Sequence, residues 1–202
     1  MGVQDTGCLR NVPAGYGLIR ELNGSCRYFP DNQFVSANFR MKEFNPSGVR
    51  PYGVMRKLVN QLQVMRNALG VPIIITSAYR SGSTHASGLA VDIVVPRKSF
   101  IQLAQAAYNA GFRRIEVVKR AGTSYSNTMS FGGHVHVDVY DGSGISTSGT
   151  IYDCPTCSSR PCYPWYAFGV SGSWWATSQP NTFSQLMANL RADRGNTGYR
   201  GC

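Results

Sequence analysis

The sequence predicts an α+β fold, in which a small antiparallel sheet is flanked by helices and followed by a C-terminal appendage containing cysteine and tryptophan. Apolar residues recur at helical spacing between Arg50 and Gly70, which indicates an amphipathic helix. Short runs of β-branched and apolar residues follow it, as far as residue 140. With 202 residues, 43% of them hydrophobic, the chain is long enough to bury one substantial core.

Changes in composition divide the chain into four parts. Residues 1–35 are rich in Gly, Asn, Asp and Pro without sustained periodicity, which predicts an N-terminal arm, closed by Cys8 and Cys26. Residues 36–142 form the predicted core. Residues 143–150 are almost entirely Gly, Ser and Thr, the composition of a flexible linker. Residues 151–202 form the predicted appendage, which holds all three tryptophans.

The elements of the core follow from periodicity and from start and stop signals. Pro51 suits the first turn of a helix, and Gly70 suits its end. Ser99 and Gln102 form a capping box that opens a second helix, which ends near Gly111. The predicted helices cover 50–70, 99–111 and 181–192, and the predicted strands cover 71–77, 89–95, 115–118 and 134–140.

The formal charge of +10 predicts attraction to polyanions, a class that includes nucleic acid, anionic membranes and the bacterial wall. The basic residues are scattered, with no run of five or more, so the charge names a class of partner only. No apolar run is long enough for a membrane span. Residues 1–10 lack the basic-then-apolar order of a signal peptide.

Six cysteines lie in the first 26 and the last 49 residues, so the central region folds without bridges. An even number suits disulfides in an oxidising setting. Cys154, Cys157 and Cys162 could instead supply three ligands of a structural zinc site. We favour disulfides because no closely spaced fourth ligand follows, and Cys202 would have to return from the far terminus.

Two short segments contain all three histidines of the chain, each together with a carboxylate. In residues 83–92, His85 is expected on a loop and Asp92 in a strand. In residues 134–138, the period of two places His134, His136 and Asp138 on one face of a strand, with valines on the other. Three ligands drawn from His and Asp, with a fourth position left to water, are typical of a catalytic zinc site.

These segments resemble the M15 peptidase family, which includes D-alanyl-D-alanine carboxypeptidases, D-Ala-D-Ala dipeptidases and phage L-alanyl-D-glutamate endopeptidases. The resemblance covers residues 38–140 and implies a fold like that of the hedgehog signalling domain and the DD-peptidases. It implies zinc-dependent hydrolysis of peptidoglycan stem peptides, of the D,D-carboxypeptidase or L,D-endopeptidase type. The matching pieces are residues 39–44, residues 76–81, the SxHxxGxAxD pattern of residues 83–92 and the HxH pattern at His134 and His136.

The resemblance implies a role for each matching residue. The zinc ligands are His85, Asp92 and His136. His134 lies by the metal without binding it, and it stabilises the transition state or moves a proton. Arg80 contacts the substrate carboxylate or the charged intermediate, a task that suits its permanently charged fork. The last matching position, Ser83, supports the site and binds substrate.

Two departures from the family pattern affect the cleft and the catalytic base. Only Ser81 and Gly82 separate the Tyr-Arg motif from Ser83, where relatives commonly have a longer loop. The stretch before the last histidine also lacks the glutamate base of several members. We therefore assign the base to His134, with Glu116 and Asp138 as alternatives, and we expect Asp138 to orient a ligand histidine.

Two other functions compete with hydrolysis of the wall. One is a non-catalytic, zinc-containing binding module, as in hedgehog proteins. The other is a nucleic-acid-binding protein with a cysteine knuckle, but the charges are scattered and no helix-turn-helix or RNA-binding signature is present. We expect no specific nucleic acid partner. The missing signal peptide favours a phage lysin or a virion-associated enzyme, and the cysteines favour an extracytoplasmic destination.

Overall fold

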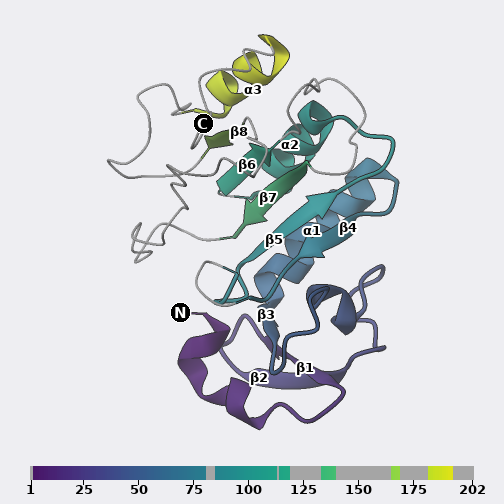
Figure 1. Ribbon diagram of the computed structural model, residues 1–202, viewed down its shortest axis with the longest axis vertical. Helices are drawn as coiled ribbons and strands as arrows, with labels where there is room; N and C mark the ends of the chain where they lie inside the picture. The colour runs from purple at the N-terminus through teal and green to yellow at the C-terminus, as the bar shows by residue number, and fades with distance from the viewer. Residues whose placement is uncertain are drawn as a thin grey trace, which may run out of the picture.

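The computed structural model describes residues 2–80, 85–112, 114–118, 133–139, 165–168 and 182–192, and in these residues the fold is α+β, as predicted (Figure 1). A five-stranded antiparallel sheet has the order β4-β5-β7-β6-β8, and a three-stranded sheet has the order β2-β1-β3. The strands of the larger sheet are β4 (Ile74–Ser77), β5 (Ala90–Val94), β6 (Arg114–Val118), β7 (His134–Asp138) and β8 (Trp165–Phe168).

The N-terminal residues are more regular than their composition indicates. Two short 3₁₀ helices, Val3–Thr6 and Cys8–Asn11, precede β1 (Tyr16–Arg20) and β2 (Cys26–Pro30). The first strand pairs antiparallel with β2 and parallel with β3 (Gly53–Met55). The expected disulfide between Cys8 and Cys26 is present. Sequence periodicity misses this sheet because its buried runs are only a few residues long.

Each helix buries one apolar stripe. The first helix, α1 (Arg56–Leu69), begins later than predicted, because β3 occupies the residues after Pro51. It ends at Gly70, whose φ of 68° is the left-handed conformation that glycine adopts readily. The second helix, α2 (Phe100–Asn109), opens on the predicted capping box. In that box the Gln102 N–H donates to Ser99 Oγ, and the Ser99 N–H donates to Gln102 Oε1.

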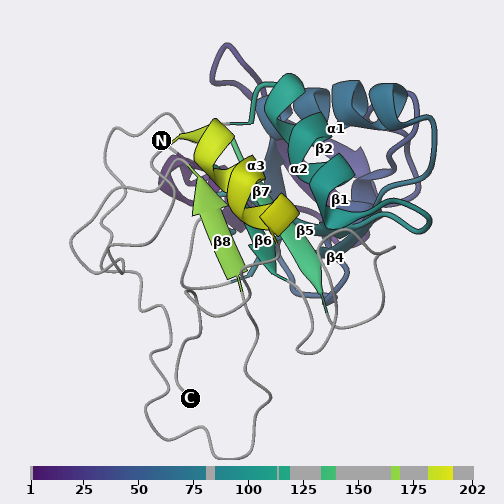
Figure 2. The ribbon, with the colours of Figure 1, turned by 90° about the horizontal axis from the view of Figure 1, so that it is seen from above.

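The helices cover one face of the five-stranded sheet. Figure 2 shows α1 and α2 on the same side of the strands. Six apolar residues of the three central strands are fully buried and belong to one apolar core with the helices: Val91, Ile93, Ile115, Val117, Val135 and Val137. Because side chains alternate along a strand, the polar residues between them lie on the opposite face. In the described residues, no helix is long and apolar enough to cross a membrane.

Two elements of the predicted appendage are joined to the core. Strand β8 pairs antiparallel with β6, and helix α3 (Phe183–Ala192) buries Leu186, Met187 and Leu190 in the main core. The linker predicted at 143–150 lies outside the described residues, so the domain boundaries stay a prediction. The cysteines at 154, 157, 162 and 202 also lie outside them, and the choice between disulfides and a second metal site stays open.

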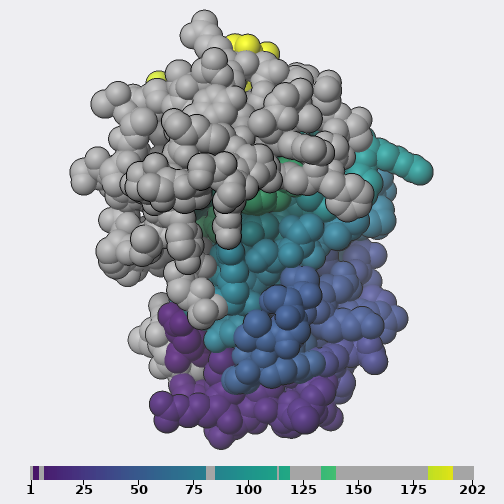
Figure 3. Space-filling view, in the orientation of Figure 1, coloured from purple at the N-terminus to yellow at the C-terminus, as the bar shows by residue number. Residues whose placement is uncertain are grey.

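The three-stranded sheet forms one end of the molecule. Figure 3 shows its N-terminal part, in purple, gathered at that end beside the blue and teal residues of the central region. Both sheets contribute to one continuous core, which includes Ile19 and Phe29 from the smaller sheet and Val91 and Val137 from the larger. The N-terminal sheet is therefore packed onto the region that carries the histidines.

Candidate metal centre

The candidate centre begins with one row of polar residues across the central strands. Asp92 of β5 is paired with His136 of β7, and His136 is paired in turn with Glu116 of β6. Directly opposed residues on paired strands project from the same face of a sheet, so these three side chains are neighbours. His134 and Asp138 flank the row two positions away along β7, as the period of two predicts.

The three residues predicted to bind zinc come together at this row. His136 Nδ1 lies 2.8 Å from Asp92 Oδ1, and His85 Nε2 lies 3.2 Å from His136 Nδ1 and 3.5 Å from Asp92 Oδ1. Bonds of about 2.0–2.1 Å to a tetrahedral ion place two ligand atoms about 3.3 Å apart. The triangle therefore has the size that one zinc ion requires. Two imidazoles and a carboxylate also form a donor set that suits zinc.

His85 has its ring orientation set by the backbone. Its Nδ1 is 2.8 Å from the carbonyl oxygen of Ala78, so an Nδ1–H group donates to that oxygen and leaves the Nε2 lone pair directed at the other two ligands. The side chain is buried, and burial lowers the pKa of His85 below its ordinary value of 6.5. The imidazole is thus neutral at neutral pH, the form that binds a metal.

The other two candidate ligands, Asp92 and His136, form a buried ion pair. Burial alone would raise the pKa of Asp92, but the hydrogen bonds from His136 and His85 hold it well below its usual range. Burial alone would lower the pKa of His136, but the carboxylates of Asp138 and Asp92 outweigh burial and raise it to about 10. A divalent cation at this site would therefore replace a proton on His136.

His134 lies beside the triangle rather than in it. Its Nε2 is 4.0 Å from Asp92 Oδ1, and about a third of the side chain (35%) is exposed. Burial of the remainder lowers the pKa of His134, so the ring is neutral at neutral pH and can accept a proton. This placement fits a group that handles protons next to a metal.

Arg80 follows β4 and lies on the exposed side of the centre. Its Nη2 is 3.5 Å from Asp92 Oδ2, and 53% of its side chain is exposed. A guanidinium in this position places a permanent positive charge at the edge of the site, where it is accessible to a substrate. Ser83, the other residue predicted to bind substrate, lies outside the described residues.

Sequence reasoning missed Arg114, which lies opposite Asp138 on β6. Its Nε is 2.5 Å from Glu116 Oε1 and 3.8 Å from Asp138 Oδ2, so the guanidinium lies between two carboxylates. Glu116, an alternative for the catalytic base, is therefore held in an ion pair. Asp138 is fully buried, with Oδ2 3.6 Å from His136 Nε2, on the side of the ring away from the other ligands. The alternation of polar and apolar residues along β6 was the available signal for Arg114.

Comparison with known proteins identifies a family. The model of a family described as Peptidase M15 matches residues 32–138, which is just over half of the chain. The matched segment includes all three candidate ligands, and it ends before β8 and α3. No curated protein and no solved structure matches the chain.

Proposed function

Since the chain belongs to the M15 peptidase family, we propose that it is a zinc-dependent peptidase that hydrolyses the stem peptides of bacterial peptidoglycan. The observation that carries the proposal is the triangle of ligand atoms from His85, Asp92 and His136, which are far apart in sequence and lie within 4.8 Å of one another. Three protein ligands with room for a fourth group are typical of catalytic zinc sites.

Three residues around the triangle have separate roles in the proposed hydrolysis. A zinc ion held by His85, Asp92 and His136 would act as a Lewis acid and would make hydroxide available near neutral pH. His134, neutral and partly exposed, accepts a proton from the attacking water and donates it to the leaving amine. Arg80 balances negative charge that develops on the substrate. Asp138, behind the ring of His136, keeps that ligand in its orientation.

The proposal extends to the substrate and to the place of action. The exposed guanidinium of Arg80 suits recognition of a carboxylate, which stem peptides carry in both the D,D-carboxypeptidase and the L,D-endopeptidase reactions. The wall lies outside the cytoplasm, and the disulfide between Cys8 and Cys26 suits an oxidising setting. We therefore propose action as a phage lysin or a virion-associated enzyme, with a fold of the hedgehog/DD-peptidase type.

The decisive experiment is digestion of purified peptidoglycan, with and without a chelator, followed by mass spectrometry of the released muropeptides. The expected result is cleavage of a stem-peptide bond that stops on chelation and returns with zinc, and the masses identify the bond. Zinc binding and wall binding without any cleavage would instead favour the alternative, a non-catalytic hedgehog-like binding module.

The roles of two histidines can be separated in the same assay. Replacing His136 by Ala removes a ligand, so zinc content and cleavage should be lost together. Replacing His134 by Ala should leave zinc content unchanged and slow cleavage by about 10²–10⁴-fold, the usual contribution of a general acid–base group. Zinc content is measured by elemental analysis of the dialysed proteins. Equal loss of zinc in both variants would overturn this division of roles.

A further inference from the structure

His85 differs from the other two candidate ligands in what holds it. Asp92 and His136 lie on β5 and β7, adjacent strands near the middle of the five-stranded sheet. His85 begins a turn over residues 85–88, which closes when the Gly88 N–H donates to the His85 carbonyl oxygen. The place of the His85 ring therefore depends on the contacts that fix this turn.

Two segments outside the turn donate hydrogen bonds to it. On one side, the Met55 N–H of β3 donates to the Gly88 carbonyl oxygen at 2.9 Å. On the other, the Val3 N–H donates to the Ser87 carbonyl oxygen, also at 2.9 Å, and Val3 itself is fully buried. The fit at Gly88 is close: a Cβ atom there would lie 2.9 Å from the Gly53 carbonyl oxygen and 3.1 Å from Val3 Cγ1.

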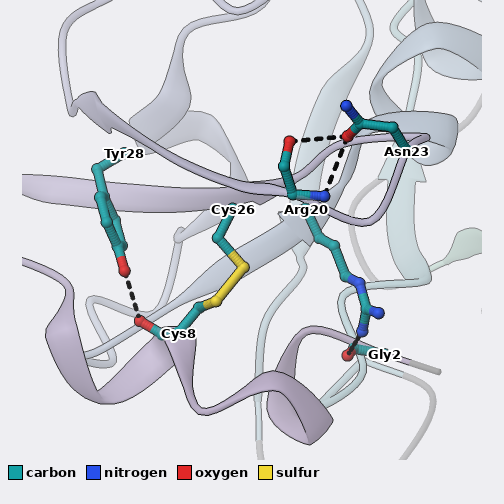
Figure 4. The surroundings of a disulfide bond; sticks show 7 residues. Gly2, Cys8, Arg20, Asn23, Cys26 and Tyr28 are labelled. Atoms are coloured by element: carbon teal, nitrogen blue, oxygen red, sulfur yellow. Dashed lines mark hydrogen bonds between the residues drawn. A yellow bond between two sulfur atoms is a disulfide. The ribbon is translucent and has the colours of Figure 1, made fainter.

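The segment that bears Val3 is anchored in turn to the N-terminal sheet (Figure 4). Arg20 Nη1 donates to the Gly2 carbonyl oxygen at 2.9 Å, and the Tyr28 hydroxyl donates to the Cys8 carbonyl oxygen at 3.1 Å. The disulfide joins Cys8 to Cys26 at the start of β2. All these anchors precede residue 32, where the match to the peptidase family begins.

We propose that residues 2–11, here called the N-terminal strap, position the metal-binding turn. The proposal rests on the metal site of the proposed function. Gly2 and Val3 are positioning residues: they fix the backbone of Ser87, two residues from His85, while the disulfide keeps the strap in place. A ligand displaced by even about 1 Å no longer meets the geometry that the metal requires. The strap therefore sets the affinity of the site for its ion.

Replacing Gly2 by Ala tests the contact with the least disturbance elsewhere. The new Cβ atom would lie closer to Ser87 Cβ than van der Waals contact permits, and 2.7 Å from Ser87 Cα. Either the turn or the strap must move, and either movement distorts the hydrogen bond from the Val3 N–H to the Ser87 carbonyl oxygen. The double variant Cys8→Ser/Cys26→Ser tests the anchor instead, because it releases the strap without touching the turn.

Zinc affinity is measured in the full chain by competition with a chromogenic chelator, and the visible spectrum of the cobalt-loaded protein reports on the geometry of the ligands. Both variants should bind zinc about tenfold or more weakly, as for residues that orient metal ligands, with an altered cobalt spectrum. The control is Phe29→Leu, a core change in β2 that lowers stability and removes none of the hydrogen bonds or the disulfide described above for the strap and the turn; its zinc affinity should equal that of the parent.

The outcomes separate this inference from the proposed function. Unchanged zinc affinity in Gly2→Ala and in the double cysteine variant would overturn the role of the strap while leaving the metal site intact. An equal loss in Phe29→Leu would also overturn it, because general loss of stability would then explain the effect. A parent protein that binds no zinc would instead remove the metal site itself, and the proposed function with it.

Discussion

Replacing Asp92 by Asn gives a direct test of the metal centre, because the two side chains have the same shape and differ in charge. Asp92 Oδ1 is 2.8 Å from His136 Nδ1 and 3.5 Å from His85 Nε2, so it forms one corner of the ligand triangle. A neutral amide oxygen is a much poorer ligand for zinc. Residues that merely orient a ligand contribute about 10–100-fold in affinity, so loss of a ligand should weaken binding by at least about 100-fold.

This loss can be converted into a shift in melting temperature. Zinc at 1,000 times its dissociation constant stabilises the parent by about 4 kcal/mol. For a chain of this size, that raises the Tm by about 8–16 °C. In Asp92→Asn the same zinc concentration is only about ten times the dissociation constant, which leaves about 1.4 kcal/mol and a rise of about 3–6 °C. Each protein is compared with itself after chelation, so changes in the metal-free stability cancel.

Asp138→Asn is the matched comparison, because it makes the same change at a buried carboxylate that touches a ligand without being one. A tenfold weaker affinity would leave about 2.7 kcal/mol, equivalent to a rise of about 5–11 °C. The expected order of the zinc-induced shift is parent, then Asp138→Asn, then Asp92→Asn. If Asp92→Asn showed the full shift of the parent, the assignment of Asp92 as a ligand would be wrong.

Three further predictions concern stability and are checked by urea unfolding. Replacing Arg114 by Met removes the positive charge between the half-buried Glu116 and the buried Asp138 and should lower the free energy of unfolding by about 3 kcal/mol; an unchanged value would contradict the pairing. Replacing Leu186 by Ala should lower the free energy of unfolding by about 2–5 kcal/mol. Ser184→Ala, at an exposed position of the same helix, should leave it almost unchanged; equal effects of the two substitutions would show that α3 is not part of the core. The pKa of Glu21 is held below its ordinary value of 4.5, mainly by its hydrogen bonds from Arg56. That stabilisation is complete above this value and is lost as the pH falls through the lower pKa of the folded state, so Glu21→Gln should show a shallower loss of stability on acidification than the parent.

Secondary structure could be predicted where an element is long or carries its own start and stop signals. Helix α2 begins where the sequence indicates because it has a capping box, and α1 ends where the sequence indicates because a glycine follows it. The start of α1 was misplaced because residues 53–55 pair with β1 instead. Such a pairing depends on partners more than thirty residues away, and no local pattern records it. The same reason explains why β8, which pairs with β6, went unpredicted. The hairpin of β1 and β2 is local, and it was missed because its buried runs are too short to show a periodicity.

The residues of the candidate metal centre were easier to select from the sequence than the strands, because carboxylates are scarce in this chain. Between residues 44 and 140 the sequence has only three acidic residues, Asp92, Glu116 and Asp138, and all three histidines fall in the same stretch. With so few candidates, the period of two along β7 was enough to select one face. Basic residues are common, twenty in all, so the alternation along β6 was the one signal for Arg114, and it does not show which carboxylates the guanidinium contacts.

The few carboxylates between residues 44 and 140 determine the net charge of the candidate centre. Three carboxylates project from one face of the sheet, and the guanidinium of Arg114 balances one of them. The remaining two negative charges match a divalent cation, which would replace the proton that His136 otherwise holds. The negative charge of residues 44–140 is thus concentrated at the candidate metal centre. All other charged residues between 44 and 140 are Lys or Arg, and this excess of positive charge would favour the proposed binding to an anionic wall.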